Sequence, residues 1–295
     1  MTKAIKTSQK SKLIAIVGET ASGKTGVAIE AAKRWNGEVI CADSRTIYKG
    51  MDVGTAKPTT DEMEGITHYG LDLVEPNESF SAAQFKDYAQ GVIADIQKRG
   101  KLPILVGGTG LYVDGVLFNY SFGGTDSKYE RSQLHNKSVD ELATIAKCEG
   151  IEVSSETLKN KRHLIRLIER GGETSDQKVL FYNTLITGVK LSKTQLRLRV
   201  EKRTELMFRK GLRKEYNDLK TKYGTEFESF SGIGYQEFAE WEDGNASMSE
   251  VKRDIVKNTM NLAKRQRTWF KRNPHIQWSD SPEAALELIA AFVDN

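Results

Sequence analysis

The 295-residue sequence is poor in cysteine and histidine, and it lacks long hydrophobic runs. Its two cysteines, Cys41 and Cys148, are too few for a disulfide framework and have no spacing that would make a zinc site. His68, His135 and His275 have no partner at the spacing of a metal site or a catalytic triad. These absences favour a reducing compartment and argue against zinc or triad chemistry.

No segment is apolar enough to suggest export or membrane insertion. Residues 1–12 are polar and include four lysines, and the apolar run that follows spans only residues 13–17. Such a run is too short for a signal-peptide core or a membrane span, so we expect a cytoplasmic protein with a short polar tail. The net charge of +4 is mild, and it permits a nucleic-acid partner without demanding one.

The hydrophobic patterns favour an α/β fold. A chain of this length suggests one large domain or two unequal ones. Patterns typical of buried strands at residues 12–17, 38–42 and 102–106 alternate with helical patterns at residues 26–35 and 82–99. This alternation predicts a parallel sheet flanked by helices.

The middle of the chain has a different character. Strand signals vanish over residues 120–178, where charges are dense and two short helical patterns appear. Further on, the spacing of apolar residues predicts one long helix over residues 194–223, whereas residues 49–76 predict a long loop near the site. Because residues 18–25 also match a P-loop pattern between a predicted strand and a predicted helix, we predict a P-loop NTPase-like core, formed by residues 1–119 and 179–295, with a helical insertion domain between its parts.

Residues 18–25 (GETASGKT) match the P-loop pattern of glycine, four residues, then glycine, lysine and serine or threonine. In that geometry backbone N–H groups converge on phosphate oxygens, the lysine adds a positive charge, and the last hydroxyl ligates Mg²⁺. The pattern predicts a diphosphate site formed by Gly18, Glu19, Thr20, Ala21, Ser22, Gly23, Lys24 and Thr25. Thr25 is its predicted metal ligand, and Mg²⁺ is the expected cofactor.

Asp43 directly follows the second predicted strand. Ligands of open α/β sheets bind at the C-terminal ends of the strands, so we expect Asp43 to face the same crevice as Lys24. The loop alone does not say whether its ligand is ATP or another pyrophosphate compound, nor which bond is broken.

Four further motifs carry a resemblance to a known family. They are residues 43–48 (DSRTIY), 50–58 (GMDVGTAKP), 106–112 (VGGTGLY) and 261–270 (NLAKRQRTWF). With the P-loop, this set closely resembles the bacterial tRNA dimethylallyltransferase family. The resemblance covers nearly the whole chain in the family's order, and the second and fourth motifs are its most specific parts.

The resemblance implies that a dimethylallyl group passes from dimethylallyl diphosphate to N6 of adenosine 37 in tRNA, with release of pyrophosphate. It implies that Thr109 aligns the adenine amine and that Arg203 stabilises the leaving group. An adenine amine is a poor nucleophile because its lone pair is delocalised into the ring, so a carboxylate that accepts its proton assists attack. Asp43 is the predicted catalytic base.

The resemblance also implies a set of tRNA-binding residues, because the target base must leave the stack of the anticodon loop. On the core the set comprises Asp43, Ser44, Arg45, Thr46, Thr109, Lys264, Arg265 and Arg267. On the insertion it comprises Arg131, Arg162, His163 and Arg166. The expected partners are the anticodon stem-loop of tRNA and dimethylallyl diphosphate, with no membrane, and we expect a monomer.

Other activities remain open on the residues alone. A P-loop small-molecule kinase would hold ATP in the loop and use Asp43 as base or Mg²⁺ ligand, although no arginine-rich lid is evident. A prenyltransferase acting on free adenine nucleotides would not need an RNA-clamping insertion or a basic C-terminal helix. The intact loop and Asp43 argue against a third alternative, a non-catalytic RNA-binding module.

Overall fold

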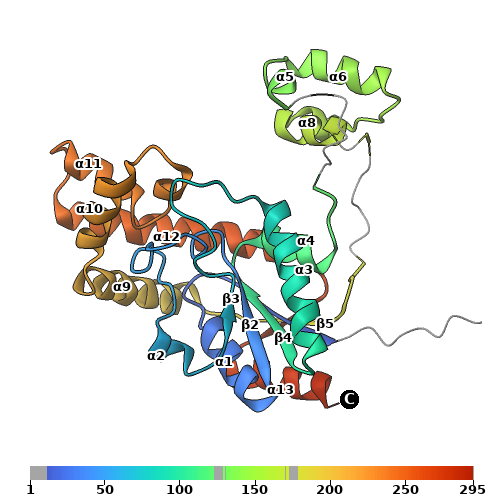
Figure 1. Cartoon of the computed structure of the whole chain (residues 1–295). Helices are drawn as coiled ribbons and strands as arrows, with labels where there is room; N and C mark the ends of the chain where they lie inside the picture. Colours follow the sequence, from blue (N-terminus) through green and yellow to red (C-terminus); the bar gives the residue numbers. More distant parts are fainter. Residues whose placement is uncertain (1–11, 123–128, 130, 170, 173–178, 295) are drawn as a thin grey trace, which may run out of the picture. The chain divides into compact units, whose positions relative to one another are not determined.

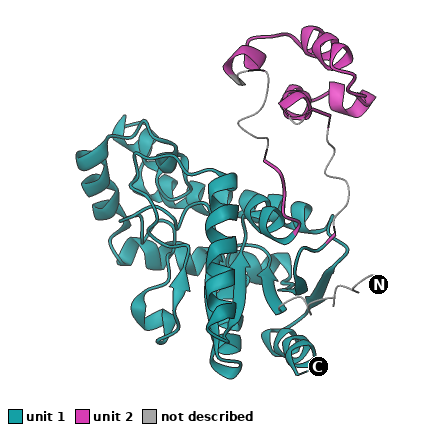
Figure 2. Ribbon diagram, turned by 45° about the vertical axis from the view of Figure 1, so that its right-hand side comes forward, with its two compact units in different colours: residues 1–117, 180–295 teal, residues 118–179 magenta. Residues whose placement is uncertain are grey.

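The computed structural model of the chain describes residues 12–122, 129, 131–169, 171–172 and 179–294. The chain forms two compact units, one of residues 1–117 and 180–295 and the other of residues 118–179 (Figure 2). The predicted helical insertion falls within the second unit.

A six-stranded parallel sheet forms the centre of the larger unit (Figure 1). Its strands are β1 (Lys12–Val17), β2 (Gly37–Ala42), β3 (His68–Tyr69), β4 (Leu102–Gly107), β5 (Asn183–Val189) and β6 (Ile276–Ser279). They lie in the order β3-β2-β4-β1-β5-β6, so β1 pairs with β4 on one side and with β5 on the other. The predicted parallel α/β fold is confirmed.

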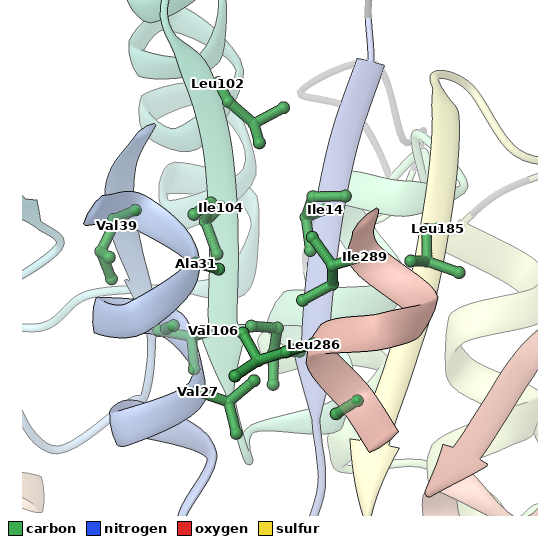
Figure 3. Packing of buried hydrophobic residues seen from close by; sticks show 14 of the residues in the cluster. Ile14, Val27, Ala31, Val39, Leu102, Ile104, Val106, Leu185, Leu286 and Ile289 are labelled. Atoms are coloured by element: carbon green, nitrogen blue, oxygen red, sulfur yellow. The ribbon is translucent and has the colours of Figure 1, made fainter. Parts of the chain in front are cut away.

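Helices cover both faces of this sheet. The helices that contact the strands are α1 (Lys24–Arg34), α3 (Ala82–Lys98), α4 (Gly110–Leu117) and α13 (Pro282–Val293). The larger unit also contains α2 (Thr60–Met63), α9 (Lys193–Arg209), α10 (Leu212–Tyr223), α11 (Ala239–Glu242) and α12 (Met248–Phe270). Figure 3 shows Val27 of α1 and Leu286 of α13 packed on one face of the sheet, beside Ile14 and Val106. Burial on both faces explains why the strands read as continuous apolar runs.

Three of the long helices begin in the same way. The hydroxyls of Ser81, Ser192 and Ser247 each accept the N–H three residues ahead, at the starts of α3, α9 and α12. A glutamine or glutamate at that position reaches back to the serine N–H, completing a capping box. The polar residues before each apolar stripe therefore fix where these helices start.

Two predictions about the larger unit were wrong. The single helix expected over residues 194–223 is two helices, α9 and α10, separated at Gly211, whose φ of 94° lies in the left-handed region that favours glycine. The loop expected over residues 49–76 contains α2 and the edge strand β3. A two-residue strand has no periodicity of its own that a sequence pattern could reveal.

The smaller unit has its own apolar core. It contains α5 (Arg131–His135), α6 (Val139–Cys148), α7 (Ser155–Leu158) and α8 (Lys161–Glu169). Leu142 of α6 packs with Leu164 and Ile168 of α8 in one buried cluster. Across both units, none of the helices in the described residues combines the length and hydropathy that a membrane span needs.

Candidate functional site

The glycine-rich loop, residues 18–25, runs from the end of β1 into α1. Lys24 turns back on this loop, and its Nζ donates to the Glu19 carbonyl at 3.0 Å. Ser22 is buried, and its Oγ has no hydrogen-bond partner among the described residues. Because a buried hydroxyl without a partner is costly, this atom suits an added polar ligand.

The pKa of Lys24 lies closer to neutral pH than that of an ordinary lysine. Burial lowers the pKa of Lys24 to about 8, although the neighbouring Asp43 acts in the opposite direction. A negatively charged ligand in the loop would favour the ammonium form. Binding of such a ligand is therefore coupled to proton binding at Lys24.

Helix α9 brings two arginines to the glycine-rich loop. Arg203 Nη1 donates to Thr20 Oγ1 at 2.9 Å, and Arg199 Nη1 donates to the Ser22 carbonyl at 3.0 Å. Burial lowers the pKa of Arg203, and Asp43 opposes this shift. The structure thus places Arg203 beside the loop and adds Arg199, which was not among the predicted site residues, as a support for the loop backbone.

The ends of β2 and β4 bring Asp43, Ser44 and Thr109 together, because these strands are neighbours in the sheet. The Thr109 hydroxyl accepts a hydrogen bond from the Ser44 N–H at 3.0 Å. Asp43 Oδ1 accepts the Arg45 N–H at 2.8 Å, which fixes the carboxylate at the strand end. Arg45 itself is anchored, since its Nη1 donates to the Glu228 carbonyl at 2.9 Å.

Two cavities flank these residues. The loop cavity, of about 420 Å³, is bordered by Lys24, Thr25 and Thr46. The outer cavity, of about 440 Å³, is bordered by Ser44, Arg45, Thr109, Arg265 and Trp269, among others.

The two cavities share a wall. Among the described residues, the side chains that line both are Thr20, Asp43, Thr55, Arg203 and Met207. A group that moves from the loop cavity to the outer cavity must pass these residues. The carboxylate of Asp43 therefore lies where two ligands, one in each cavity, could meet.

Thr46 lines the loop cavity, whereas its sequence neighbours Ser44 and Arg45 line the outer cavity. It was grouped with Ser44 and Arg45 as a tRNA-binding residue, but it lines the loop cavity. Its side chain is buried, and its Oγ1 has no partner among the described residues. The geometry suits a contact with whatever the glycine-rich loop holds.

Helix α12, like α9, holds the glycine-rich loop through side-chain hydrogen bonds. Gln266 accepts the Thr20 N–H at 2.7 Å and donates to the Gly108 carbonyl at 3.0 Å. Glu19 pairs with Arg267, so its carboxylate does not add negative charge unopposed to the loop. Sequence reasoning missed Gln266 as a site residue, although it lies inside the 261–270 motif.

A second loop, residues 51–58, contributes Thr55 to the shared wall and is held by one carboxylate of α10. Glu215 accepts the N–H groups of Asp52 at 3.0 Å, Val53 at 2.7 Å and Gly54 at 2.9 Å. Tyr235 donates its hydroxyl to the same carboxylate at 2.7 Å. No sequence pattern indicates Glu215, because the backbone N–H groups that its carboxylate accepts lie 161 to 163 positions away.

The aromatic ring of Tyr235 also explains Gly54. A Cβ at this position would lie 2.4 Å from the ring. Only glycine lets the loop backbone approach so closely. The 50–58 motif therefore encodes packing as well as chemistry.

The remaining residues predicted to bind tRNA are distributed over both units. Arg162, His163 and Arg166 are exposed on α8, on the face opposite to its buried leucine and isoleucines. Lys264 and Arg265 are exposed on α12. The side chain of Arg131 lies outside the described part of the structure.

The fold and the site define an α/β protein in which two cavities meet at a carboxylate, beside a loop that bears a buried lysine. The family model described as IPP transferase matches residues 46–273. The chain belongs to this family.

Relatives and solved structures agree with this assignment. The tRNA dimethylallyltransferase of Staphylococcus epidermidis strain ATCC 35984 is 39% identical over 94% of this chain and 89% of its own length. The tRNA isopentenylpyrophosphate transferase of Bacillus halodurans is 35% identical, with a TM-score of 0.75 over 97% of each chain. A eukaryotic dimethylallyltransferase acting on tRNA is 25% identical, with a TM-score of 0.82 over 98% of this chain and 80% of its own.

Proposed function

We propose that the protein transfers a dimethylallyl group from dimethylallyl diphosphate to N6 of adenosine 37, next to the anticodon in tRNA, and releases pyrophosphate. Family membership supports the reaction class. The structural observation that carries the proposal is the wall shared by the two cavities, with Asp43 in it. The loop cavity takes the donor, and the outer cavity takes the adenine.

The chemistry needs one bond to break and one to form. The N6 lone pair attacks the prenyl carbon that carries the diphosphate, the carbon–oxygen bond breaks, and pyrophosphate leaves with the bonding electrons. N6 loses a proton, which Asp43 accepts. Because the Asp43 carboxylate lines both cavities, it can reach an amine that faces a donor on the other side.

Pyrophosphate gains negative charge as it leaves, so the transition state requires positive charge and N–H donors in the loop cavity. Lys24 lines this cavity, and Arg203 is held beside it through Thr20. Burial removes both cations from bulk water, so their attraction to the leaving group is less screened than it would be in solution. Their fixed positions mean that little reorganisation accompanies bond breaking.

The loop cavity also suits Mg²⁺. Thr25 and Asp43 line the cavity with oxygen atoms, and Mg²⁺ is usually held by one or two protein oxygens together with phosphates and water. In the proposal Thr25 would hold the ion, which would supply positive charge to stabilise the departing pyrophosphate.

The outer cavity has the features that an extruded adenine requires. Ser44 and Thr109 present polar groups at the strand ends, while Trp269 offers an aromatic surface and is 36% exposed. Flipped bases are commonly bound by hydrogen bonds to their edges and by stacking on aromatic rings. Arg265 at the cavity edge suits the neighbouring phosphates.

The proposal is tested by incubating the protein with dimethylallyl diphosphate, Mg²⁺ and unmodified tRNA, then digesting the tRNA to nucleosides. We expect N6-dimethylallyladenosine from position 37. Asp43→Asn should lower turnover by a factor of at least about 100 while tRNA affinity changes little. In a parallel incubation that also contains ATP, ATP hydrolysis or a phosphorylated product, without prenylated adenosine, would show that the site is a kinase instead.

A further inference from the structure

The wall between the two cavities is mostly polar. Thr20, Asp43, Thr55 and Arg203 carry hydroxyls or charges, and Met207 is the one wholly apolar member among the described residues that line both cavities. The group that must cross this wall is a five-carbon hydrocarbon. Polar side chains contribute little to its binding, so Met207 is the main apolar contact that the shared wall can offer.

Met207 is also held in place. It lies on α9, one helical turn beyond Arg203, and is only 7% exposed. It belongs to a buried cluster that includes Ile255 of α12 and Phe238. These buried neighbours restrict the movement of its side chain, which lines both cavities.

The preceding residue on α9, Leu206, provides a natural comparison. Leu206 is 46% exposed and lines the loop cavity but not the outer cavity, within the described residues. It has a similar apolar volume on the same helix. A change at Leu206 therefore alters the loop cavity without altering the shared wall.

We infer that Met207 determines the length of the prenyl group that the enzyme transfers. The inference rests on the proposed function and goes beyond it by assigning donor selectivity to one side chain. With the diphosphate in the glycine-rich loop, the reacting carbon must lie at the wall near Asp43, and the hydrocarbon beyond that carbon packs against Met207. A longer tail collides with the supported thioether before its first carbon reaches the reacting position.

The expected size of the effect follows from hydrophobic burial. Each methylene removed from water improves binding by a factor of about four. Met207→Ala removes most of the thioether arm and opens space at the junction for part of a longer tail. Ten-carbon geranyl diphosphate undergoes the same bond changes as the five-carbon donor, so only the fit of the tail differs.

The test compares kcat/KM for geranyl and dimethylallyl diphosphate, with the same tRNA, in wild type and three variants. Met207→Ala should raise the ratio of geranyl to dimethylallyl activity at least about tenfold. Leu206→Ala should leave that ratio within about threefold of wild type. Met207→Phe should lower kcat/KM for the five-carbon donor at least about tenfold, while the affinity for inorganic pyrophosphate stays unchanged.

The outcomes separate the two levels of the proposal. A wild-type enzyme that makes no dimethylallyladenosine overturns the proposed function itself. If the wild type is active but Met207→Ala does not change the ratio of geranyl to dimethylallyl activity, only the role of Met207 is overturned. The same holds if Leu206→Ala raises this ratio as much as Met207→Ala does. If Met207→Ala does not fold, full five-carbon activity in a folded Met207→Phe variant overturns the inference on its own.

Discussion

At the scale of single residues, the lowered pKa of Lys24 predicts that donor affinity depends on pH. Burial lowers the pKa of its ammonium to about 8 in the unliganded protein, whereas a bound diphosphate favours the charged form. Below this pKa the donor binds a lysine that is already protonated. Above it, binding must take up a proton, so affinity falls as pH rises.

We therefore predict that the Kd of dimethylallyl diphosphate is about tenfold higher at pH 9 than at pH 7. The terminal phosphate of the donor loses its last proton at about pH 6, so it does not titrate between pH 7 and pH 9. Calorimetric titration at each pH measures the effect. Lys24→Arg, which stays charged throughout, should show a Kd that does not vary with pH; a slope in both proteins would assign the effect to another group.

Thr46 provides a second expectation. Its buried Oγ1 lines the loop cavity and has no partner among the described residues. Thr46→Val keeps the shape and removes the hydroxyl, so we predict that the Kd of dimethylallyl diphosphate rises about fivefold, the equivalent of one hydrogen bond. Filter binding of labelled tRNA should be unchanged. Weakened tRNA binding with unchanged donor binding would return Thr46 to the tRNA-binding set.

At the scale of elements, the loop of residues 51–58 depends on α10, a helix that contributes none of the described residues of the shared wall. Glu215 of α10 accepts three successive backbone N–H groups and the Tyr235 hydroxyl. On the other side of this loop, Lys57 donates to the Tyr48 carbonyl at 2.8 Å and pairs with two aspartates. This double attachment fixes Thr55 at the junction of the cavities.

Replacing the carboxylate should therefore affect turnover more than donor binding. Glu215→Gln places an amide N–H₂ opposite N–H donors of the loop, and we predict that kcat falls between about tenfold and 100-fold. The Kd of dimethylallyl diphosphate should change less than about threefold, because the glycine-rich loop is untouched. Tyr235→Phe, which removes one donor of four, is the matched control and should retain most activity.

Steady-state kinetics and a donor titration on the same preparations decide the matter. Equal losses of kcat and of donor affinity, together with a lowered melting temperature, would mean that Glu215 only maintains the fold. Full activity of Glu215→Gln would show that the loop needs no such anchor.

Elements with long patterns could be predicted from the sequence, and contacts between distant residues could not. The strands β1 and β4 and the helices α1 and α3 have apolar spacing over whole turns or runs, so their positions are close to those expected. The break between α9 and α10 was missed because leucines continue the helical stripe on both sides of Gly211. One glycine changed the path of the chain without interrupting the pattern.

The site shows the same limit. Asp43 was predicted to face the crevice because it follows a parallel strand, and Thr109 was predicted from the family resemblance. The structure places both at the ends of neighbouring strands. The side on which Thr46 lies, the bridge from Gln266 to Thr20, and the carboxylate of Glu215 depend on how α10 and α12 pack against the loops. Those contacts join residues more than 100 positions apart, and no local pattern records them.

At the scale of the whole molecule, the smaller unit carries two exposed arginines that were predicted to bind RNA, Arg162 and Arg166. Arg162 and Arg166 are exposed on α8, one turn apart. If both contact phosphates, Arg162→Ala with Arg166→Ala should weaken tRNA binding and reduce the slope of log Kd against log salt concentration by about 1.5. Dimethylallyl transfer at saturating tRNA should persist.

The control for this prediction is Lys147→Ala, which removes an exposed cation from α6 of the same unit. Its salt slope should match that of wild type. A slope that falls equally in the control would mean that the charge of the unit, and not the α8 face, governs tRNA binding.

The expected monomeric state stays a prediction, which light scattering of the purified protein can test.

The central claim is that the glycine-rich loop holds the pyrophosphate that leaves, and that the bond broken joins carbon to oxygen. The most direct measurement uses dimethylallyl diphosphate labelled with ¹⁸O at the oxygen between the prenyl carbon and phosphorus, turned over with tRNA and analysed by mass spectrometry. The account predicts that all of the label leaves in pyrophosphate. Label found in prenyl alcohol or prenyl monophosphate would place the cleavage at phosphorus and contradict the account.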